Sequence, residues 1–378
     1  MDRSRGQDRE GDRGDAHGAG SDRDQRLPEA VRHGRGAATN PVGRFEPYAR
    51  LRVDDGWDPG DELRPLRTEV ALERPRRIIT RNTSPDIPFD RSINPYRGCE
   101  HGCVYCFARP SHAFLGLSPG LDFETRLVAK PEAPRLLAQE LARPGYVPGV
   151  MAIGTNTDPY QPLEARMRIM RGLLEVLRDF GHPVSIVTKG TLIERDLDIL
   201  GPMAAEGLAQ VAVSLPTLDR KLARSLEPRA AAPERRLQVI RAVAGAGVPV
   251  RVMVAPVIPG LTEHELEAIL AAARDAGARG AAYTALRLPR EVADLFADWV
   301  QRAVPGRAAK ILSAVREMHG GRDYDPAWGR RMSGTGVRAD LLRSRFRAAR
   351  RRLGLDQPFP PLDTRRFRPP GPVQLALF

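Results

Sequence analysis

The chain contains three cysteines, Cys99, Cys103 and Cys106, and all of them lie within eight positions. An odd and tightly clustered set cannot form a disulfide framework, and such a cluster is typical of metal or redox chemistry. Thiolates spaced this closely on one loop can bind separate irons of a cubane iron–sulfur cluster. Because a cubane has four irons and the loop offers three thiolates, one iron would stay open, as in catalytic metal sites.

Zinc is the alternative metal for this loop. His101 and His112 lie nearby, and three cysteines with one histidine form a common type of zinc site. Structural zinc sites usually take their ligands from two separated pairs, whereas a single loop supplies all the thiolates here. A non-catalytic, nucleic-acid-associated module that holds zinc or a structural cluster is therefore the second hypothesis for this chain.

The segments around the loop alternate between strand-like and helix-like patterns. Helical segments, with apolar residues three or four positions apart, separate short runs rich in β-branched residues. The runs cover residues 149–155, 183–190, 209–215, 248–255 and 280–288. With residues 91–98 as the first strand, the pattern predicts six β/α units with parallel strands, arranged as an α/β barrel or a doubly wound sheet. In either fold the functional edge lies at the carboxyl ends of the strands.

The string NPYRGCEHGCVYC, residues 94–106, resembles the radical S-adenosylmethionine (SAM) superfamily, in the branch related to spore photoproduct lyase. The resemblance rests on the CxxxCxxC spacing, on the aromatic residue before the third cysteine and on the place after the first strand. It implies an α/β fold with a partial (β/α)6 TIM-type barrel. It also implies a 4Fe–4S cluster on Cys99, Cys103 and Cys106, with SAM bound to the fourth iron.

The resemblance further implies the chemistry of the enzyme. Reduction of the cluster, with reduced flavodoxin or ferredoxin as the electron donor, cleaves SAM to methionine and a 5′-deoxyadenosyl radical. This radical abstracts hydrogen from a substrate, and the cofactor carries the chemistry while the protein orients it. Spore photoproduct lyase itself uses an additional cysteine as hydrogen donor, which this chain lacks. In this chain, the hydrogen donor to the product radical would be a tyrosine, another substrate or returned 5′-deoxyadenosine.

Polar residues at the ends of the later strands match positions that contact SAM in this family. Two of these residues follow the second strand, one follows the third strand and one follows the fourth strand. A further residue, an isoleucine, lies in PVIPGLTE, a segment similar to the family's GxIxGxxE element. With the aromatic residue of the cysteine loop, the predicted cofactor-binding residues are Thr155, Asn156, Lys189, Ser214, Ile258 and Tyr105. The segment TNTDP also suits an Asx-turn and a helix N-cap.

Asp158 and Tyr160, in the segment DPYQPLE after the second strand, are the predicted catalytic residues that face the substrate. For the tyrosine, packing at the start of a helix is the structural alternative.

The charge of the chain makes nucleic acid a candidate substrate or partner. The net charge is +12, and residues 305–378 contribute +10, from sixteen Arg or Lys against six Asp or Glu. Such a basic segment is typical of a protein that binds polyanions. Only four of the 59 basic residues are lysines, so an arginine-rich composition of the coding sequence is the stronger explanation of the charge alone.

Four segments are expected along the chain. Residues 1–40 balance eight acidic against eight basic residues with few apolar ones, which predicts a disordered tail. A lead-in over 41–90, the barrel over 91–300 and a basic, mainly helical extension over 301–378 follow. The first twenty residues contain no apolar run, and no stretch approaches the roughly 20 apolar residues of a membrane span. We therefore expect a cytoplasmic protein without a membrane anchor.

Overall fold

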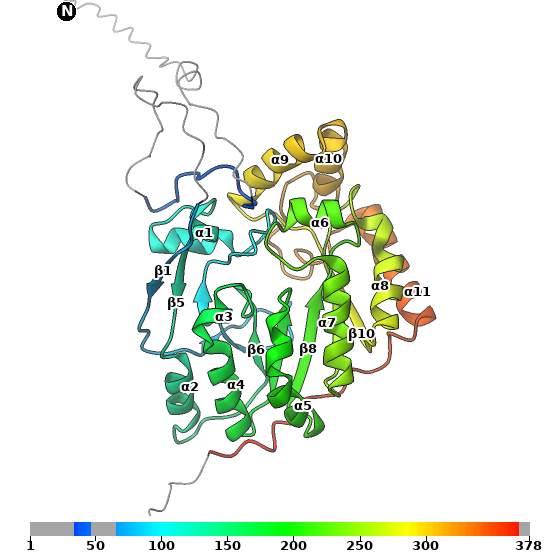
Figure 1. Cartoon of the computed structure of the whole chain (residues 1–378). Coiled ribbons are helices and arrows are strands. Elements are labelled where there is room, and N and C mark those ends of the chain that lie inside the picture. The colour runs from blue at the N-terminus through cyan, green and yellow to red at the C-terminus, as the bar shows by residue number, and fades with distance from the viewer. Residues whose placement is uncertain (1–33, 47–65, 370–378) are drawn as a thin grey trace, which may run out of the picture.

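The computed structural model describes residues 34–46 and 66–369, so most of the predicted disordered tail lies outside the described residues. A parallel sheet forms the centre of the molecule (Figure 1). Its strands, in spatial order, are β3 (Arg91–Ile93), β6 (Met151–Ile153), β7 (Val184–Thr188), β8 (Ala209–Ser214), β9 (Val250–Val257) and β10 (Gly280–Ala285). All neighbouring pairs are parallel and follow the chain order. Within residues 34–46 and 66–369, β10 and β3 do not pair, so the sheet is open there, which confirms the predicted partial (β/α)6 barrel.

Helices cover the outer face of this sheet (Figure 1). They are α2 (Ala133–Leu141), α4 (Ile169–Asp179), α5 (Leu197–Ala205), α7 (Pro233–Gly245) and α8 (Leu266–Asp275). Each presents an apolar stripe to the strands; in α4, for example, Leu173, Leu174 and Leu177 are fully buried. The strands β3 and β6 are buried at every residue, as expected for parallel strands with both faces covered.

A second, smaller sheet lies beside the first barrel strand. In it β1 (Glu69–Leu72) pairs in parallel with β5 (Arg126–Ala129), which pairs in antiparallel with β4 (Tyr96–Arg97). The short strand β2 (Thr80–Arg81) extends the main sheet by antiparallel pairing with β3. Part of the lead-in segment is therefore built into the edge of the barrel next to the cysteine loop. The cysteine loop itself continues into η1 (Arg109–Leu115) and α1 (Asp122–Thr125).

The C-terminal extension is mainly helical, as predicted. It contains α10 (Ala308–Met318) and α11 (Gly336–Arg352), and α9 (Val292–Ala303) crosses the predicted boundary between the barrel and the extension. Arginines of α11 pair with carboxylates beside α8: Arg345 Nη2 lies 2.6 Å from Glu267 Oε2, and Arg338 Nη1 lies 2.9 Å from Glu263 Oε1. Part of the positive charge of this helix is therefore used for packing. Within the described ranges, none of the helices combines the length and apolar character needed to cross a bilayer.

Candidate functional site

The cysteine loop lies at the carboxyl end of β3 and is fixed at both ends by backbone hydrogen bonds. Cys99 N donates to Phe123 O at 2.9 Å, and Val104 N donates to Leu226 O at 3.0 Å. Gly102 has φ +69°, and a Cβ there would lie 2.7 Å from a carboxylate oxygen of Glu124. The tight turn between the first two cysteines therefore requires glycine.

The side chain of Arg109 stabilises the cysteine loop through hydrogen bonds. Its side chain is fully buried, and its Nε donates to Cys103 O at 3.0 Å. Its Nη2 lies 2.5 Å from Glu124 Oε1, and Glu124 also accepts hydrogen bonds from the backbone amides of Gly36 and Ala37 at 2.9 Å. Because each charge of this buried pair is compensated, the pair can fix the shape of the loop. The sequence analysis missed both residues.

The three thiols lie in two apolar clusters that Cys106 joins. Cys103 packs with Tyr105 and Ile258, whereas Cys99 packs with Phe123, and the half-buried Cys106 contacts both groups. In residues 34–46 and 66–369, no three His, Cys, Asp or Glu side chains converge as one ion requires. In a cubane each thiolate binds a different iron, so three thiols supplied by one loop suit such a cluster. Burial raises the pKa of Cys103 and Cys106, which bound metal charge would offset.

Lys189 and Ser214, predicted from the ends of the third and fourth strands, lie side by side. Lys189 Nζ donates to Ser214 Oγ at 2.5 Å and lies 3.4 Å from Glu227 Oε1. The same Glu227 oxygen is 3.8 Å from Cys103 Sγ. The lysine ammonium therefore reaches the immediate surroundings of the cysteine loop, across the carboxyl ends of β7 and β8.

Glu227 is the centre of a buried polar network that the sequence analysis missed. Its carboxylate accepts hydrogen bonds from the Arg236 guanidinium and the Tyr105 hydroxyl. Arg236 Nη1 also donates to Ser214 O at 3.0 Å. Burial alone would raise the pKa of Glu227, but the charges of Arg236 and Lys189 lower it to about 2. Tyr105 is therefore anchored through its hydroxyl beside Cys103.

Thr155 and Asn156 lie at the carboxyl end of β6, where Asn94 holds them. Asn94 Nδ2 donates to Thr155 Oγ1 at 3.1 Å, and Asn156 N donates to Asn94 Oδ1 at 2.9 Å. Asn156 Nδ2 also donates to Ser111 Oγ at 3.2 Å, so the second strand is tied to the segment after the cysteines. The asparagine of the NPYRGC string was the available signal for this contact.

Ile258 is fully buried in the same apolar cluster as Cys103 and Tyr105, so it forms part of the wall beside the cysteine loop.

Asp158 and Tyr160 follow β6 as expected, but their side chains are turned inward and buried. Asp158 accepts hydrogen bonds from Thr188 Oγ1 and Lys189 N, both at 2.7 Å, and lies 3.4 Å from His101 Nδ1. Burial opposes its ionisation, but His101 lowers the pKa of Asp158 to about 2. Tyr160 is 1% exposed, and its hydroxyl donates to Asp196 at 3.2 Å. Asp158 therefore positions the backbone of Lys189, and Tyr160 packs in the core, as the structural alternative had it.

A half-buried cation lies next to the residue that follows Cys106. The guanidinium carbon of Arg287, which follows β10, is 4.0 Å from the ring centre of Phe107, the residue after Cys106. Phe107 is 44% exposed, and the Tyr324 side chain interacts with Arg287. Burial lowers the pKa of Arg287, and no carboxylate lies within 4.0 Å of it among the described residues. The sequence analysis missed Arg287 because it lies in a loop with no recognisable motif.

Comparisons with known proteins agree with this geometry. The sequence model of the radical SAM superfamily matches residues 93–273. An uncharacterised protein of Mycobacterium tuberculosis is 39% identical over 294 residues, which cover 77% of this chain and 83% of that protein. One of Methanocaldococcus jannaschii is 24% identical over 173 residues, covering 46% of this chain and 62% of that protein.

Solved structures of spore photoproduct lyase share the fold. A cysteine-to-serine mutant of that enzyme has a TM-score of 0.54 at 16% identity, covering 75% of this chain and 79% of its own. A double mutant with bound AdoMet and dinucleoside spore photoproduct has a TM-score of 0.52 at 16% identity. The match covers 75% of this chain and 78% of the mutant chain. The chain therefore belongs to the radical SAM superfamily, whose enzymes use a 4Fe–4S cluster and SAM.

Proposed function

We propose that this enzyme holds its 4Fe–4S cluster on Cys99, Cys103 and Cys106, binds SAM against Lys189 and Ser214, and acts on nucleic acid. One observation carries the proposal: a lysine ammonium and a cysteine thiol both lie close to the same carboxylate oxygen. Glu227 Oε1 is 3.4 Å from Lys189 Nζ and 3.8 Å from Cys103 Sγ. When bound, the reduced cluster and SAM supply a 5′-deoxyadenosyl radical that can abstract hydrogen from a substrate.

The chain's own residues would bind and orient the cosubstrate. The Lys189 ammonium suits the carboxylate of SAM, and the Ser214 hydroxyl offers a donor and an acceptor beside it. Thr155 and Asn156, held by Asn94, offer further hydrogen-bonding groups at the next strand end. The buried side chains of Ile258 and Tyr105 close the wall behind Cys103 and exclude water from that side.

Charge and an exposed aromatic ring support nucleic acid as the substrate class. The guanidinium of Arg287 lies over the ring of Phe107, next to Cys106, and has no carboxylate within 4.0 Å in the part of the chain described. Unpaired arginines suit phosphates, and an exposed Phe107 offers a face on which a base can stack. Spore photoproduct lyase, which shares the fold, has been solved with a dinucleoside spore photoproduct.

The same side of the site supplies a candidate hydrogen donor. All three cysteines of the chain are assigned to the cluster, so a further cysteine is not available. Tyr324 interacts with Arg287 beside Phe107, whereas the hydroxyls of Tyr105 and Tyr160 are engaged by buried carboxylates. We therefore assign Tyr324 the donor role in this proposal.

The test is anaerobic reconstitution of the cluster, reduction with dithionite, addition of SAM and chromatographic detection of 5′-deoxyadenosine. We expect product from wild type, none from Cys103→Ala, and unchanged product from Lys310→Ala, which alters an exposed lysine of α10. DNA and RNA oligonucleotides are then added in turn, and the expected result is faster product formation with one of them. A loaded cluster that binds no SAM would overturn the proposal, and bound zinc in place of iron would favour the scaffold hypothesis.

A further inference from the structure

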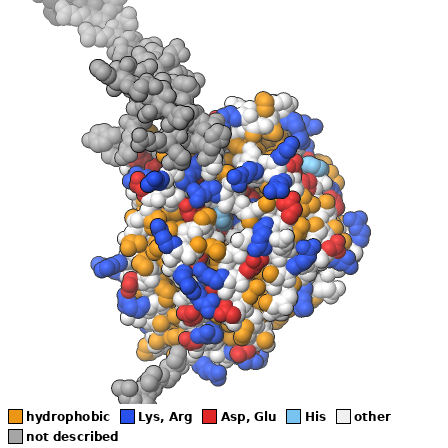
Figure 2. Space-filling model, viewed as in Figure 1, with side chains coloured by type: hydrophobic (Ala, Val, Ile, Leu, Met, Phe, Trp, Pro, Cys, Tyr) orange, Lys and Arg blue, Asp and Glu red, His pale blue; other side chains and the backbone are white. Residues whose placement is uncertain are grey.

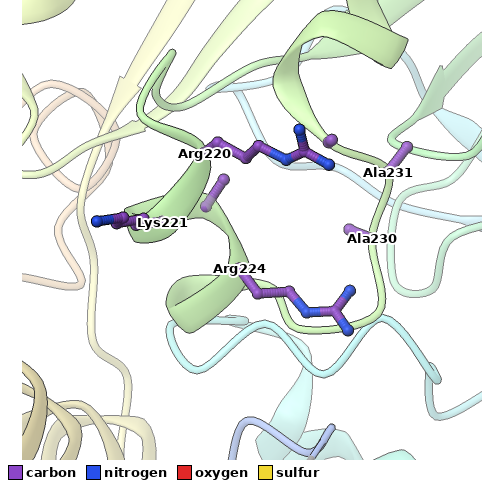
Figure 3. Close-up of a pocket in the computed structure, with 7 residues that line it drawn as sticks. Arg220, Lys221, Arg224, Ala230 and Ala231 are labelled. Carbon is purple, nitrogen blue, oxygen red and sulfur yellow. The ribbon is translucent and has the colours of Figure 1, made fainter.

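A surface groove of about 590 Å³ lies between α6 (Arg220–Leu226) and the segment 230–232. Its lining consists of three cations and four alanines: Arg220, Lys221, Arg224, Ala223, Ala230, Ala231 and Ala232. Figure 3 shows the side chains of Arg220 and Arg224 extending from α6 toward the segment that carries Ala230 and Ala231, while Lys221 points away from the groove. Side chains of Lys and Arg are also prominent on the face that Figure 2 shows. The α6 wall of the groove therefore carries two guanidinium groups, and the opposite wall, residues 230–232, is apolar.

These cations have no partner within the described ranges. No carboxylate lies within 4.0 Å of Arg220, Lys221 or Arg224. The nearby Asp219 accepts hydrogen bonds from backbone amides at the start of α6. By contrast, the adjacent Arg235 pairs with Glu194. Like charges four positions apart, as in Arg220 and Arg224, destabilise a helix, so this arrangement does not serve the stability of α6.

The groove is linked directly to the cysteine loop. The two walls are joined by residues 225–229, where Leu226 O accepts from Val104 N at 3.0 Å and Arg229 N donates to His101 O at 3.2 Å. Glu227, in the same segment, lies 3.8 Å from Cys103 Sγ. The three residue steps from Arg224 to Glu227 span at most about 11 Å even when fully extended. The groove wall is therefore separated from the cysteine loop by a short stretch of chain.

We propose that this groove is the docking surface for an acidic one-electron carrier protein. The inference rests on the proposed function, because a redox cluster needs an external electron: the carrier loses one electron, the cluster gains it, and no bond or proton moves. Electron tunnelling weakens exponentially with distance, so a carrier has to dock close to a cluster ligand. Opposite charge on the two surfaces would steer and orient the encounter.

A phosphodiester backbone is the other anion that such cations attract. The four alanines of the lining offer a phosphate no side-chain hydrogen-bond donor, whereas a mixed apolar and cationic patch is typical of a protein interface. Arg287, which lies over Phe107, is the cation that we have assigned to nucleic acid.

The experiment compares Arg220→Glu/Arg224→Glu with a matched control, Arg241→Glu/Arg279→Glu, in the full chain. Both control arginines are exposed and lack a carboxylate partner among the described residues. The probe is a purified flavodoxin, whose binding in the oxidised state is measured by calorimetry at low salt. A second readout is the rate at which reduced flavodoxin, or dithionite, bleaches the cluster absorbance. Circular dichroism and the Tm establish that each variant is folded, and Arg220→Ala/Arg224→Ala serves as a milder variant.

We expect the groove variant to lose at least about tenfold in flavodoxin binding and reduction rate, with the control within about twofold of wild type. The rate at which dithionite reduces the cluster should be the same in the groove variant as in wild type. Equal flavodoxin binding by both double variants, or none by wild type, overturns the proposal. So does a loss of DNA oligonucleotide binding with flavodoxin binding intact. Binding of oxidised flavodoxin needs no turnover, so it decides the docking surface even if wild type fails to cleave SAM.

Discussion

Lys189 and Glu227 form an ion pair, with Nζ 3.4 Å from Oε1, at the carboxyl edge of the barrel. The same carboxylate also accepts a hydrogen bond from the Arg236 guanidinium, so one negative charge faces two positive charges. The three groups together therefore carry a net positive charge next to Ser214. An anionic group such as the carboxylate of SAM would complete this arrangement.

Lys189→Met should weaken SAM binding by at least about tenfold, because a charge-assisted hydrogen bond is worth roughly 1.5–3 kcal/mol. Calorimetry on the reconstituted protein under anaerobic conditions measures the change in Kd. Lys310→Met, on the exposed face of α10, should bind as wild type does. Equal affinities for both variants would remove Lys189 from the cosubstrate site.

Glu227→Gln should destabilise the protein without metal by about 3 kcal/mol, because it leaves the buried guanidinium of Arg236 without a countercharge. Urea unfolding measures the free energy. The control is Glu267→Gln, which breaks a part-exposed pair with Arg345 and should cost no more than about 1 kcal/mol. Similar losses in the two variants would contradict the role of Glu227 as the centre of the network.

Arg109→Lys should lower the iron content after reconstitution to less than about half of wild type. The substitution keeps the charge but loses the planar fork that reaches Glu124 and the carbonyls of Cys103 and Gly120 together. Iron and sulfide per chain provide the measurement. Arg135→Lys changes an exposed arginine paired with Glu132, and normal iron content is expected there. Full cluster occupancy in Arg109→Lys would show that the loop does not depend on this fork.

Stability should fall in acid through two buried histidines, His112 in η1 and His182 before β7. Burial lowers the pKa of His112 and His182 to about 4, from an ordinary value of 6.5. The unfolded chain therefore binds more protons between about pH 6.5 and 4, so the free energy of unfolding decreases as the pH falls through that range. Each histidine contributes up to about 3 kcal/mol. His182→Gln should flatten the pH dependence seen in urea titrations; an unchanged slope would exclude its contribution.

The strand order was predictable from the sequence because the alternation of β-rich and helical runs repeats six times. The strand-end rule also located Lys189 and Ser214, since parallel strands direct their carboxyl ends to one edge. The second sheet was not predictable, because β1 pairs with β5 across a long sequence separation and both are short.

The buried supports of the site were the part that sequence patterns could not reveal. Glu227 and Arg109 meet their partners only through tertiary packing, and no local motif distinguishes them from surface charges. The direction of a side chain at a strand end is equally hidden. Asp158 and Tyr160 follow β6 as expected, but hydrogen bonds to Thr188 and Asp196 turn both side chains inward.

The most direct measurement is electron paramagnetic resonance of the reduced protein with and without SAM. The account predicts a 4Fe–4S signal whose g values shift when SAM is added, because three cysteines leave one iron open to the cosubstrate. The shift should weaken in Lys189→Met at the same SAM concentration. Identical spectra with and without SAM, from a fully loaded wild-type cluster, would contradict the claim that this loop builds a SAM-binding cluster.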